Sequence, residues 1–356
     1  RRQRQMCIRD SLSGIQTIEP EYVDVEAMLD TSGDEAEVDF SEVMGHESLK
    51  RGVEIAAAGM HNILMTGPAG AGKSMIARRI PTILPRLSLE ESIEITKVYS
   101  VAGLLDESCH IINRRPFRAP HHTISLHALS GGGHNPRPGE ISLAHGGVLF
   151  LDELPEFSRP VTEGLRQPLE DGAITVSRAA RSVTYPADFM LVASMNPCPC
   201  GNYGSATAEC TCSPSQIHRY LGKLSGPLLD RIDIHVEVDN VTYDELQTDD
   251  LAEDSATIRE RVNRARAVQE ARLGASGKHT NSQMSPSDIK KYCKIDHQST
   301  EMLRESFEKL NLSARAYNRI LKVARTIADL DGSENITSRH IAESLQYRTL
   351  DRKYRV

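Results

Sequence analysis

The pattern of hydrophobic and polar positions changes twice along the chain. Residues 1 to about 42 show no sustained periodicity, and we expect a largely disordered, acidic linker there. From residue 43 to about 240, short apolar runs alternate with stretches of helical spacing, which is typical of an α/β domain with a parallel sheet. Residues 241–356 show helical spacing, so we expect a second, all-helical domain.

Four short segments rich in apolar residues predict strands of the parallel sheet, because each is followed by a loop or a helix. They are Asn62–Thr66, Val148–Asp152, Phe189–Ser194 and Ile234–Val238. A helix is expected from Ser74, with Pro81 and Pro85 bringing it to an end. In the helical domain, Ser285 and Ser313 predict the caps at which two helices begin.

Composition narrows the class of protein. Hydrophobic residues make up 39% and charged residues 26%, which supplies a core and excludes a wholly disordered chain. No apolar run approaches the ~20 residues of a membrane helix, and no hydrophobic segment follows the basic residues 1–10 as in a signal peptide. We therefore expect a cytoplasmic protein with no membrane partner. Because the sequence starts with Arg1 rather than Met, we expect it to be part of a longer protein.

The net charge leaves nucleic-acid binding open. The formal charge is −7, but Ser11–Leu49 alone holds eleven acidic residues and no Lys or Arg. The body of the chain is therefore close to neutral. Binding to nucleic-acid phosphates depends on local basic groups, so the total charge excludes nothing here.

A phosphate-binding motif follows the first predicted strand. The pattern G-x-x-x-x-G-K-[ST] is matched by a segment that we call the phosphate loop: Gly67, Pro68, Ala69, Gly70, Ala71, Gly72, Lys73 and Ser74. Its glycines let backbone N–H groups turn inward around an anion, and the following helix points its positive end at the phosphates. Lys73 would neutralise the β- and γ-phosphates of ATP, and Ser74 would hold Mg²⁺.

Polar side chains end two further predicted strands. Asp152 and Glu153 follow four apolar residues, and we expect Asp152 to support Mg²⁺ and Glu153 to polarise the attacking water. Asn196 ends the next run, where its amide would hold that water or contact the γ-phosphate. Together with the phosphate loop, these residues predict an ATPase.

A cysteine cluster lies beyond the third predicted strand. Four of the seven cysteines crowd into a short segment: Cys198, Cys200, Cys210 and Cys212. An odd total argues against a disulfide framework. Four thiolates in one loop can enclose a tetrahedral, structural Zn²⁺, and the intervening residues offer little apolar material to order the loop otherwise. We expect zinc, with reduced free thiols as the alternative.

The order of these motifs resembles that of AAA+ ATPases. The motifs after the phosphate loop are Leu149–Glu153, Ser194–Pro197 and Leu228–Arg231. Segments that resemble the magnesium-chelatase-like branch are Arg118–His122 and Pro138–Ala144. Two segments are similar to the ComM/YifB family of bacterial proteins, Asn196–Gly201 and Ser225–Asp233. The resemblance covers residues 40 to about 350.

The resemblance implies a three-layer αβα P-loop domain with β-hairpin insertions and a helical lid. It also implies an ATP-dependent hexameric ring that acts on DNA as a helicase and promotes branch migration in natural transformation. Asn196 would be sensor 1, Arg231 the arginine finger given to a neighbour's ATP, and Arg315 sensor 2 from the lid. Family members carry an N-terminal Lon-protease-like domain, and nothing in this sequence resembles it.

Two insertions bear on the partner of the motor. Residues 172–185 predict a β-hairpin with Arg178 and Arg181 at its tip, and Gly131–Gly133 predict a second hairpin tip. By the resemblance the first hairpin faces the pore, where its arginines would bind DNA phosphates without reading bases. An ordinary surface hairpin is the alternative.

Two other functions compete with the DNA motor. The first is a chelatase-type remodelling ATPase that acts on a protein partner, because such ATPases share both insertions. The second is a nucleotide-dependent scaffold without hydrolysis, which the presence of both Glu153 and Arg231 disfavours.

Overall fold

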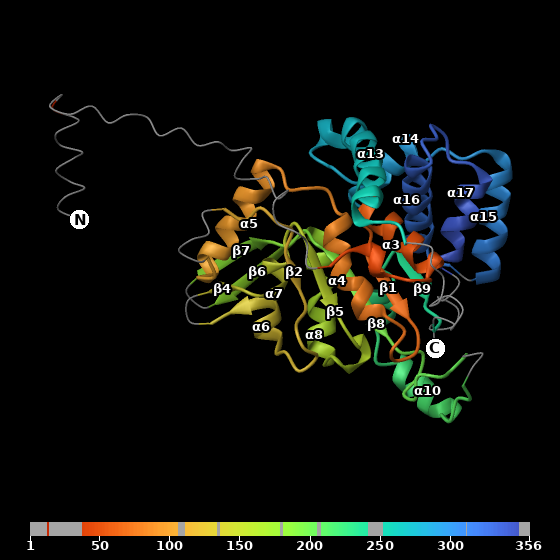
Figure 1. The fold of residues 1–356 in the computed structure, drawn as a ribbon, viewed down its shortest axis with the longest axis horizontal. Coiled ribbons are helices and arrows are strands. Elements are labelled where there is room, and N and C mark those ends of the chain that lie inside the picture. Colours follow the sequence, from red (N-terminus) through yellow and green to blue (C-terminus); the bar gives the residue numbers. More distant parts are fainter. Residues whose placement is uncertain are drawn as a thin grey trace.

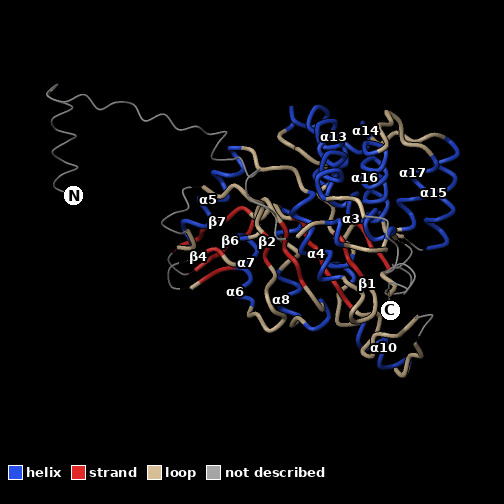
Figure 2. The backbone as a smooth tube through the Cα atoms, in the orientation of Figure 1, coloured by secondary structure: helices blue, strands red, loops and turns tan. Residues whose placement is uncertain are grey.

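The computed structural model describes residues 13, 38–105, 111–133, 136–178, 181–204, 208–240, 252–310 and 312–348. Its centre is a five-stranded parallel sheet with the order β2-β5-β8-β1-β9 (Figure 1, Figure 2). The strands are β1 (Ile63–Thr66), β2 (Phe117–Arg118), β5 (Val148–Leu151), β8 (Met190–Met195) and β9 (Ile234–Glu237). The four predicted strands and the α/β class are confirmed. Strand β2 was not predicted, because two half-buried residues leave no hydrophobic pattern.

Helices cover both faces of the sheet and make three layers. Ile63 and Met65 of β1 pack on one face with α3 (Glu47–Gly59) and α4 (Lys73–Ile83). Leu64 points to the other face and belongs to a second core cluster. Both faces are buried, which explains why the central strands β1, β5 and β8 are almost entirely apolar, whereas the edge strand β9 alternates apolar with polar residues. Helices of the second face include α6 (Leu126–Ser130), α7 (Glu140–Leu143), α8 (Arg159–Gly164), α10 (Pro214–Leu221) and α11 (Gly226–Leu229).

Two antiparallel hairpins are inserted into this body. Strands β6 (Ala173–Arg178) and β7 (Arg181–Pro186) form the predicted hairpin, in which Arg178 pairs with Arg181. Strands β3 (Gly131–Gly132) and β4 (Arg137–Pro138) form the second. The Tyr185 hydroxyl donates a hydrogen bond of 2.9 Å to the Pro136 carbonyl and so links the two insertions. The hairpin predicted over residues 172–185 is confirmed, and the second insertion is also a hairpin, but Gly131 and Gly132 lie in its strand β3 rather than at its tip.

The C-terminal part is helical, as predicted. Its helices are α13 (Ser255–Leu273), α14 (Pro286–Tyr292), α15 (His297–Leu310), α16 (Ala314–Leu330) and α17 (Ser338–Gln346). The side chains of Ser285 and Ser313 cap α14 and α16, which confirms both predicted starts. Val262 of α13 and Val323 of α16 are fully buried in the core that contains β1 and β9. The helical part, called the lid below, therefore shares a core with the body.

One helix prediction was wrong. Pro81 lies inside α4 rather than ending it, because it falls in the last turn, where its missing N–H costs a single hydrogen bond. The helix ends at Ile83, and Leu84 before Pro85 is extended, with ψ at 152°. The residue before a proline prefers that conformation, so Pro85 is the effective stop.

The last residues that the sequence assigned to the linker pack against the body. Phe40, in the 3₁₀ turn η1 (Phe40–Glu42), is 1% exposed and lies in the core cluster of α3 and α4. The Asp39 carboxylate accepts hydrogen bonds from the backbone N–H groups of Ser41 and Ser255. This segment therefore joins the start of the body to the start of the lid.

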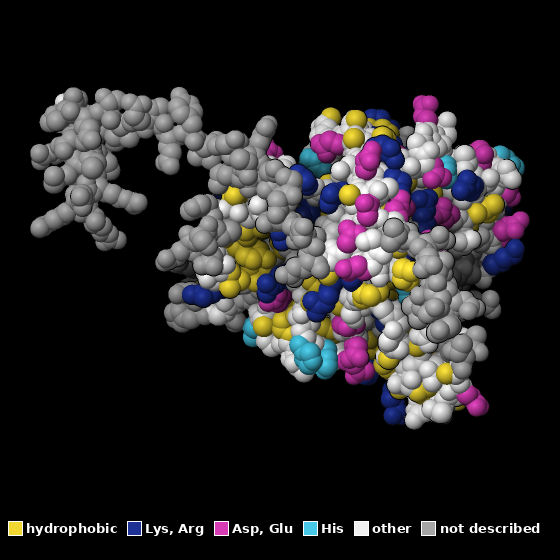
Figure 3. Space-filling model, viewed as in Figure 1, with side chains coloured by type: hydrophobic (Ala, Val, Ile, Leu, Met, Phe, Trp, Pro, Cys, Tyr) yellow, Lys and Arg dark blue, Asp and Glu magenta, His cyan; other side chains and the backbone are white. Residues whose placement is uncertain are grey.

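The surface in Figure 3 mixes charged and apolar side chains, with a hydrophobic patch near α5 (Leu89–Ala102) and β7. A groove there is lined by Ile93, Val101 and Tyr185. Among the described residues, none of the helices is long and apolar enough to cross a membrane.

Candidate functional site

The carboxyl ends of the parallel strands bring the predicted nucleotide residues together. The phosphate loop follows β1, Asp152 and Glu153 follow β5, and Asn196 follows β8, which lies between the other two strands. Since all these pairings are parallel, the segments leave the sheet at the same edge. We call this the carboxyl edge.

The phosphate loop has the backbone that its glycines predict. Gly70 and Gly72 have φ of 83° and 75°, which side chains rarely adopt, and Gly72 is the N-cap of α4. A Cβ on Gly67 would lie 2.1 Å from the Val238 carbonyl oxygen, so this position requires glycine. The Lys73 ammonium donates hydrogen bonds of 2.7 Å to the carbonyls of Gly67 and Pro68.

Lys73 is a buried cation surrounded mainly by backbone. Burial lowers the pKa of its ammonium, while the nearby carboxylates of Asp152 and Glu153 oppose that shift. An anion bound at the loop would stabilise the charged form, because an opposite charge at short range offsets desolvation. The arrangement suits a polyphosphate.

Ser74 and Asp152 meet as a magnesium site requires. The Ser74 hydroxyl donates a hydrogen bond of 2.7 Å to one carboxylate oxygen of Asp152. The Ser194 hydroxyl donates to the other oxygen and so fixes the orientation of the carboxylate. Hydroxyl and carboxylate oxygens are the ligands that Mg²⁺ prefers, and the residues present fit the ion. The sequence analysis missed Ser194, although it stands two positions before Asn196.

Glu153 sits in a strained conformation with access to water. Its φ of 54° and ψ of 50° lie in the left-handed region, which costs a non-glycine residue roughly 1–2 kcal/mol. The Glu153 N–H donates to Asp152 and to the Ser194 hydroxyl, which holds this backbone in place. Its exposed side chain lines a cavity of about 410 Å³ together with Asn196 and Arg219. Strain of this kind is common at functional sites.

Asn196 connects this cavity to the phosphate loop. Its amide oxygen lies 3.4 Å from the Lys73 ammonium nitrogen. The predicted base Glu153 and sensor Asn196 are thus brought together with Lys73. Arg219 and Lys223, on and just after α10, add two cations at the cavity that the sequence analysis did not identify.

The two predicted arginines lie at the opposite edge of the sheet. Arg231 precedes β9, and the residues before β1 and β8 are Asn62 and Phe189. Asn62, Phe189 and Arg231 line a cleft of about 740 Å³ together with Arg315 of α16. Among the described residues that line this cleft, none belongs to the phosphate loop. We call this the amino edge. In Figure 1, α13, α14 and α16 lie above the sheet and α10 lies below it.

Arg231 is buried and paired, whereas Arg315 is exposed. Arg231 is 7% exposed, forms an ion pair with Glu170 and donates a hydrogen bond of 2.8 Å to the Pro227 carbonyl. The hydrogen bond and charge of Arg231 lower the pKa of Glu170, and the nearby charge of Arg315 adds to this. The two arginines therefore act on the same carboxylate.

A buried polar network attaches the lid beneath this cleft. The Asp233 carboxylate forms an ion pair with Arg319 of α16 and accepts a hydrogen bond of 3.2 Å from His61 Nδ1. His61 Nε2 lies 2.8 Å from the Thr326 hydroxyl. Burial lowers the pKa of His61, while the neighbouring Asp233 carboxylate opposes that shift. The sequence carried no signal for this network, because its members are scattered over the chain.

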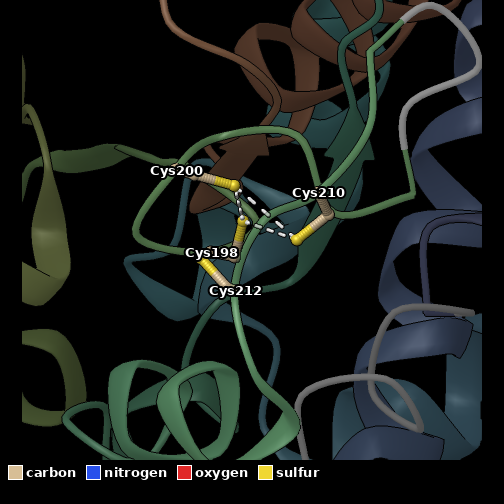
Figure 4. A group of neighbouring side chains, drawn as sticks. All are labelled: Cys198, Cys200, Cys210 and Cys212. Carbon is tan, nitrogen blue, oxygen red and sulfur yellow. Dashed lines mark hydrogen bonds between the residues drawn. The ribbon is translucent and has the colours of Figure 1, made fainter.

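The remaining predicted residues are placed as follows. The sulfur atoms of all four clustered cysteines lie within 4.8 Å of one another (Figure 4). Arg178 and Arg181 pair across the end of the β6–β7 hairpin, and their side chains lie outside the described part of the structure.

Two family models match the chain. The one described as magnesium chelatase, subunit ChlI, matches residues 39–246, and the one for the ChlI C-terminal region matches residues 252–348. Together they cover the α/β body and the described part of the lid.

Individual proteins are also similar to the chain. Competence protein ComM of Haemophilus influenzae is 48% identical over 316 residues, which are 88% of this chain and 61% of that protein. YifB of Escherichia coli K12 is 47% identical over 315 residues, again 88% and 61%. The magnesium-chelatase 38 kDa subunit of Rhodobacter capsulatus is 24% identical over 176 residues, 44% of this chain and 50% of that subunit. The chain thus spans about three fifths of the length of ComM and YifB.

Proposed function

Because the chain belongs to the ComM/YifB family of magnesium-chelatase-like AAA+ proteins, we propose that it is the motor part of a DNA helicase. In this proposal the chain hydrolyses ATP in a hexameric ring, moves on single-stranded or branched DNA in the cytoplasm and promotes branch migration during transformation or recombination. The proposal rests on the separation of the carboxyl edge from the amino edge. Because the phosphate loop and Arg231 lie at opposite edges of one sheet, a complete ATP site would need residues from two subunits.

The carboxyl edge supplies most of the chemistry. The backbone N–H groups of the phosphate loop and the Lys73 ammonium bind the β- and γ-phosphates of ATP. Ser74 and Asp152 hold Mg²⁺, which supplies charge neutralisation to the phosphates when bound. Glu153 accepts the proton of the attacking water, and Asn196 orients that water against the γ-phosphate. These residues follow β1, β5 and β8 of a single chain, which supports assigning them to one site.

The amino edge supplies the missing cation to a neighbour. Strand β1 is four residues long, so about 13 Å of sheet separates Arg231 from the phosphate loop of its own chain. A guanidinium at that distance cannot stabilise charge on its own γ-phosphate, but the cleft can receive the carboxyl edge of another subunit. Arg231 must leave Glu170 to do so. Arg315 lines the same cleft, so we assign it to the neighbour's phosphates as well.

The hairpins are the proposed DNA contacts. Arg178 and Arg181 stand at the tip of β6–β7, and Tyr185 attaches this hairpin to the loop before β4. Two linked hairpins that project from one side of each subunit would line a ring. Arginines there would bind the phosphate backbone irrespective of sequence, and the affinity would fall with added salt.

ATP hydrolysis at low salt, with and without single-stranded and forked DNA, tests this proposal. Glu153→Gln is the blank, and Arg178→Ala/Arg181→Ala is the hairpin variant. Arg264→Ala/Arg304→Ala, which removes two exposed arginines of the lid, is the charge-matched control. We expect DNA to stimulate hydrolysis in the wild type and in the control but not in the hairpin variant. Equal stimulation of both double variants would reject the hairpin as the DNA contact.

The likeness to the magnesium-chelatase 38 kDa subunit favours one second candidate. A remodelling ATPase that acts on a protein partner would use the same phosphate site and the same two edges. Hydrolysis that depends on assembly but is indifferent to every DNA form would support this candidate over the helicase.

A further inference from the structure

The four clustered cysteines converge on one point from two short segments. Cys198 and Cys200 follow β8, and Cys210 and Cys212 precede α10. The Cys198 sulfur lies 3.3 Å from that of Cys200 and 3.7 Å from that of Cys210, and the Cys200 and Cys210 sulfurs are 3.6 Å apart. All four sulfurs fall within 4.8 Å of one another, and Figure 4 shows them directed into a common space.

These distances match the edges of a single metal tetrahedron. Four sulfurs at about 2.3 Å from one Zn²⁺ lie roughly 3.8 Å from each other. A disulfide would instead bring two sulfurs to about 2.05 Å and leave the other pair unconstrained. A cluster of several irons holds its cysteine sulfurs farther apart than one ion does, because the metal atoms stand between them. We propose that Cys198, Cys200, Cys210 and Cys212 bind one structural Zn²⁺.

The surroundings of the sulfurs support a closed, structural site. Cys198 is fully buried, and its sulfur accepts a hydrogen bond of 3.3 Å from the Tyr203 N–H. Such contacts orient a thiolate ligand and balance part of its charge. With four protein ligands no position is left open for a substrate, so the ion serves the fold rather than catalysis.

The site adjoins the proposed ATP site on two sides. Cys198 stands two residues after Asn196, and Cys212 immediately precedes Ser213, the N-cap of α10. Between them, the turn at Gly201 lies against the phosphate loop: a Cβ there would be 3.8 Å from the Ala69 nitrogen. Gly201 has φ of 85°, which only glycine adopts readily. The metal therefore ties Asn196, the phosphate loop and α10 into one unit.

The zinc would support the segment beside the proposed ATP site, and this role rests on the proposed function. Removing the ion frees the segment that holds Asn196 and the cavity lined by Glu153. We expect weaker binding of ATP and slower hydrolysis. The secondary structure should be retained, because the described residues of the cysteine loop do not belong to the two hydrophobic clusters of the body.

Metal analysis of the full chain tests the site independently of any activity. The chain is purified without added metal, and zinc and iron are measured by mass spectrometry. We expect one zinc per chain in the wild type and a loss of zinc in Cys200→Ser and Cys210→Ser. Cys293→Ser is the matched control, because Cys293 is buried in the lid beside Met284 and should leave the zinc content unchanged. Iron in place of zinc, or no metal at all, would overturn the assignment.

Thiol titration of the wild-type chain keeps the test decisive if the variants fail to fold. We expect four more cysteines to react with a thiol reagent when a chelator is present than when it is absent. Cobalt added to the metal-free chain should give the visible absorption of tetrahedral cobalt thiolate. Four thiols that are equally reactive with and without the chelator would contradict the proposal. Binding of a fluorescent ATP analogue, compared before and after zinc removal, then tests the coupling, and an unchanged affinity would reject it.

Discussion

The two edges of the parallel sheet differ in what they hold and in how they are built. The carboxyl edge gathers the phosphate loop, Asp152, Glu153 and Asn196, each directly after a strand. The amino edge gathers Arg231 and residues from the lid. The carboxyl edge combines the backbone N–H groups and lysine of the phosphate loop with two carboxylates and an amide. The amino edge holds cations, several of them paired with carboxylates of the same chain.

Under the proposed function, this difference leaves the ATP site of one subunit incomplete. The charge that develops on a transferred phosphoryl group is stabilised by a cation beside it. Arg231 and Arg315 lie at the amino edge, away from the phosphate loop of their own chain. A neighbour that places its amino edge against this carboxyl edge would complete the site. The rate of ATP hydrolysis would then depend on assembly.

The largest effect is expected from Arg231→Ala. Loss of an arginine finger lowers hydrolysis by about 10³-fold or more, whereas ATP binding should remain, because the phosphate loop is untouched. Lys73→Ala should lose ATP binding at its own site but keep a working Arg231. Mixing the two inactive variants creates junctions where both groups are intact, so we expect partial recovery of ATP hydrolysis. Mixtures as inactive as their components would show that Arg231 acts within its own chain or not at all.

A smaller but still large effect is expected from Asp233→Asn, measured as stability. Asp233 is 4% exposed and pairs with Arg319, so removing its charge leaves a guanidinium without its partner and should cost about 3 kcal/mol. Urea denaturation measures the change. Glu253→Gln is the control, since its ion pair with Arg261 is partly exposed and should contribute no more than about 1 kcal/mol. Equal losses in the two variants would mean that the network does not attach the lid.

Arg315→Ala tests whether Arg315 acts on the ATP of a neighbour or on the ATP of its own chain. If Arg315 serves a neighbour, the ATP affinity of the dissociated subunit should be unchanged, and hydrolysis by the assembly should fall by about 10²-fold. Arg304→Ala, at an exposed position on α15, controls for the loss of a lid charge. Equilibrium binding of ATP is measured at a concentration where the chain is monomeric, so that no neighbour can contribute. A lower affinity in the monomer would place Arg315 at the phosphates of its own chain.

The smallest effect is expected from mild acid. Burial keeps the pKa of His61 below its usual value of about 6.5, against the opposing effect of Asp233. The unfolded chain therefore binds a proton at His61 that the folded chain does not, and stability falls as the pH drops below about 6.5. For one group the loss of stability between pH 6.5 and 5.5 is at most about 1 kcal/mol. His61→Gln should lose stability less steeply over this range. Identical slopes in denaturant titrations would show that His61 is not held neutral.

Most of the carboxyl edge could be predicted from the sequence. The phosphate loop is contiguous, and Asp152, Glu153 and Asn196 each follow a recognisable strand, so parallel pairing alone brings them together. The amino edge could not be predicted in this way. Arg231 and Arg315 are 84 positions apart, and no local pattern states that they line the same cleft. The network of His61, Asp233 and Thr326 was invisible for the same reason.

The fold class, the phosphate loop and the set of four cysteines could be derived from the sequence alone, because each depends on residues that are close together along the chain. Tertiary structure decided the rest. Strand direction sent the phosphate loop and the arginines to opposite edges, and long-range packing of α13 and α16 onto the body placed Arg315 beside Arg231. The turn at Gly201 brought the cysteine loop against the phosphate loop. These positions depend on how distant segments pack on the two faces of one sheet, and no single segment of the sequence contains that information.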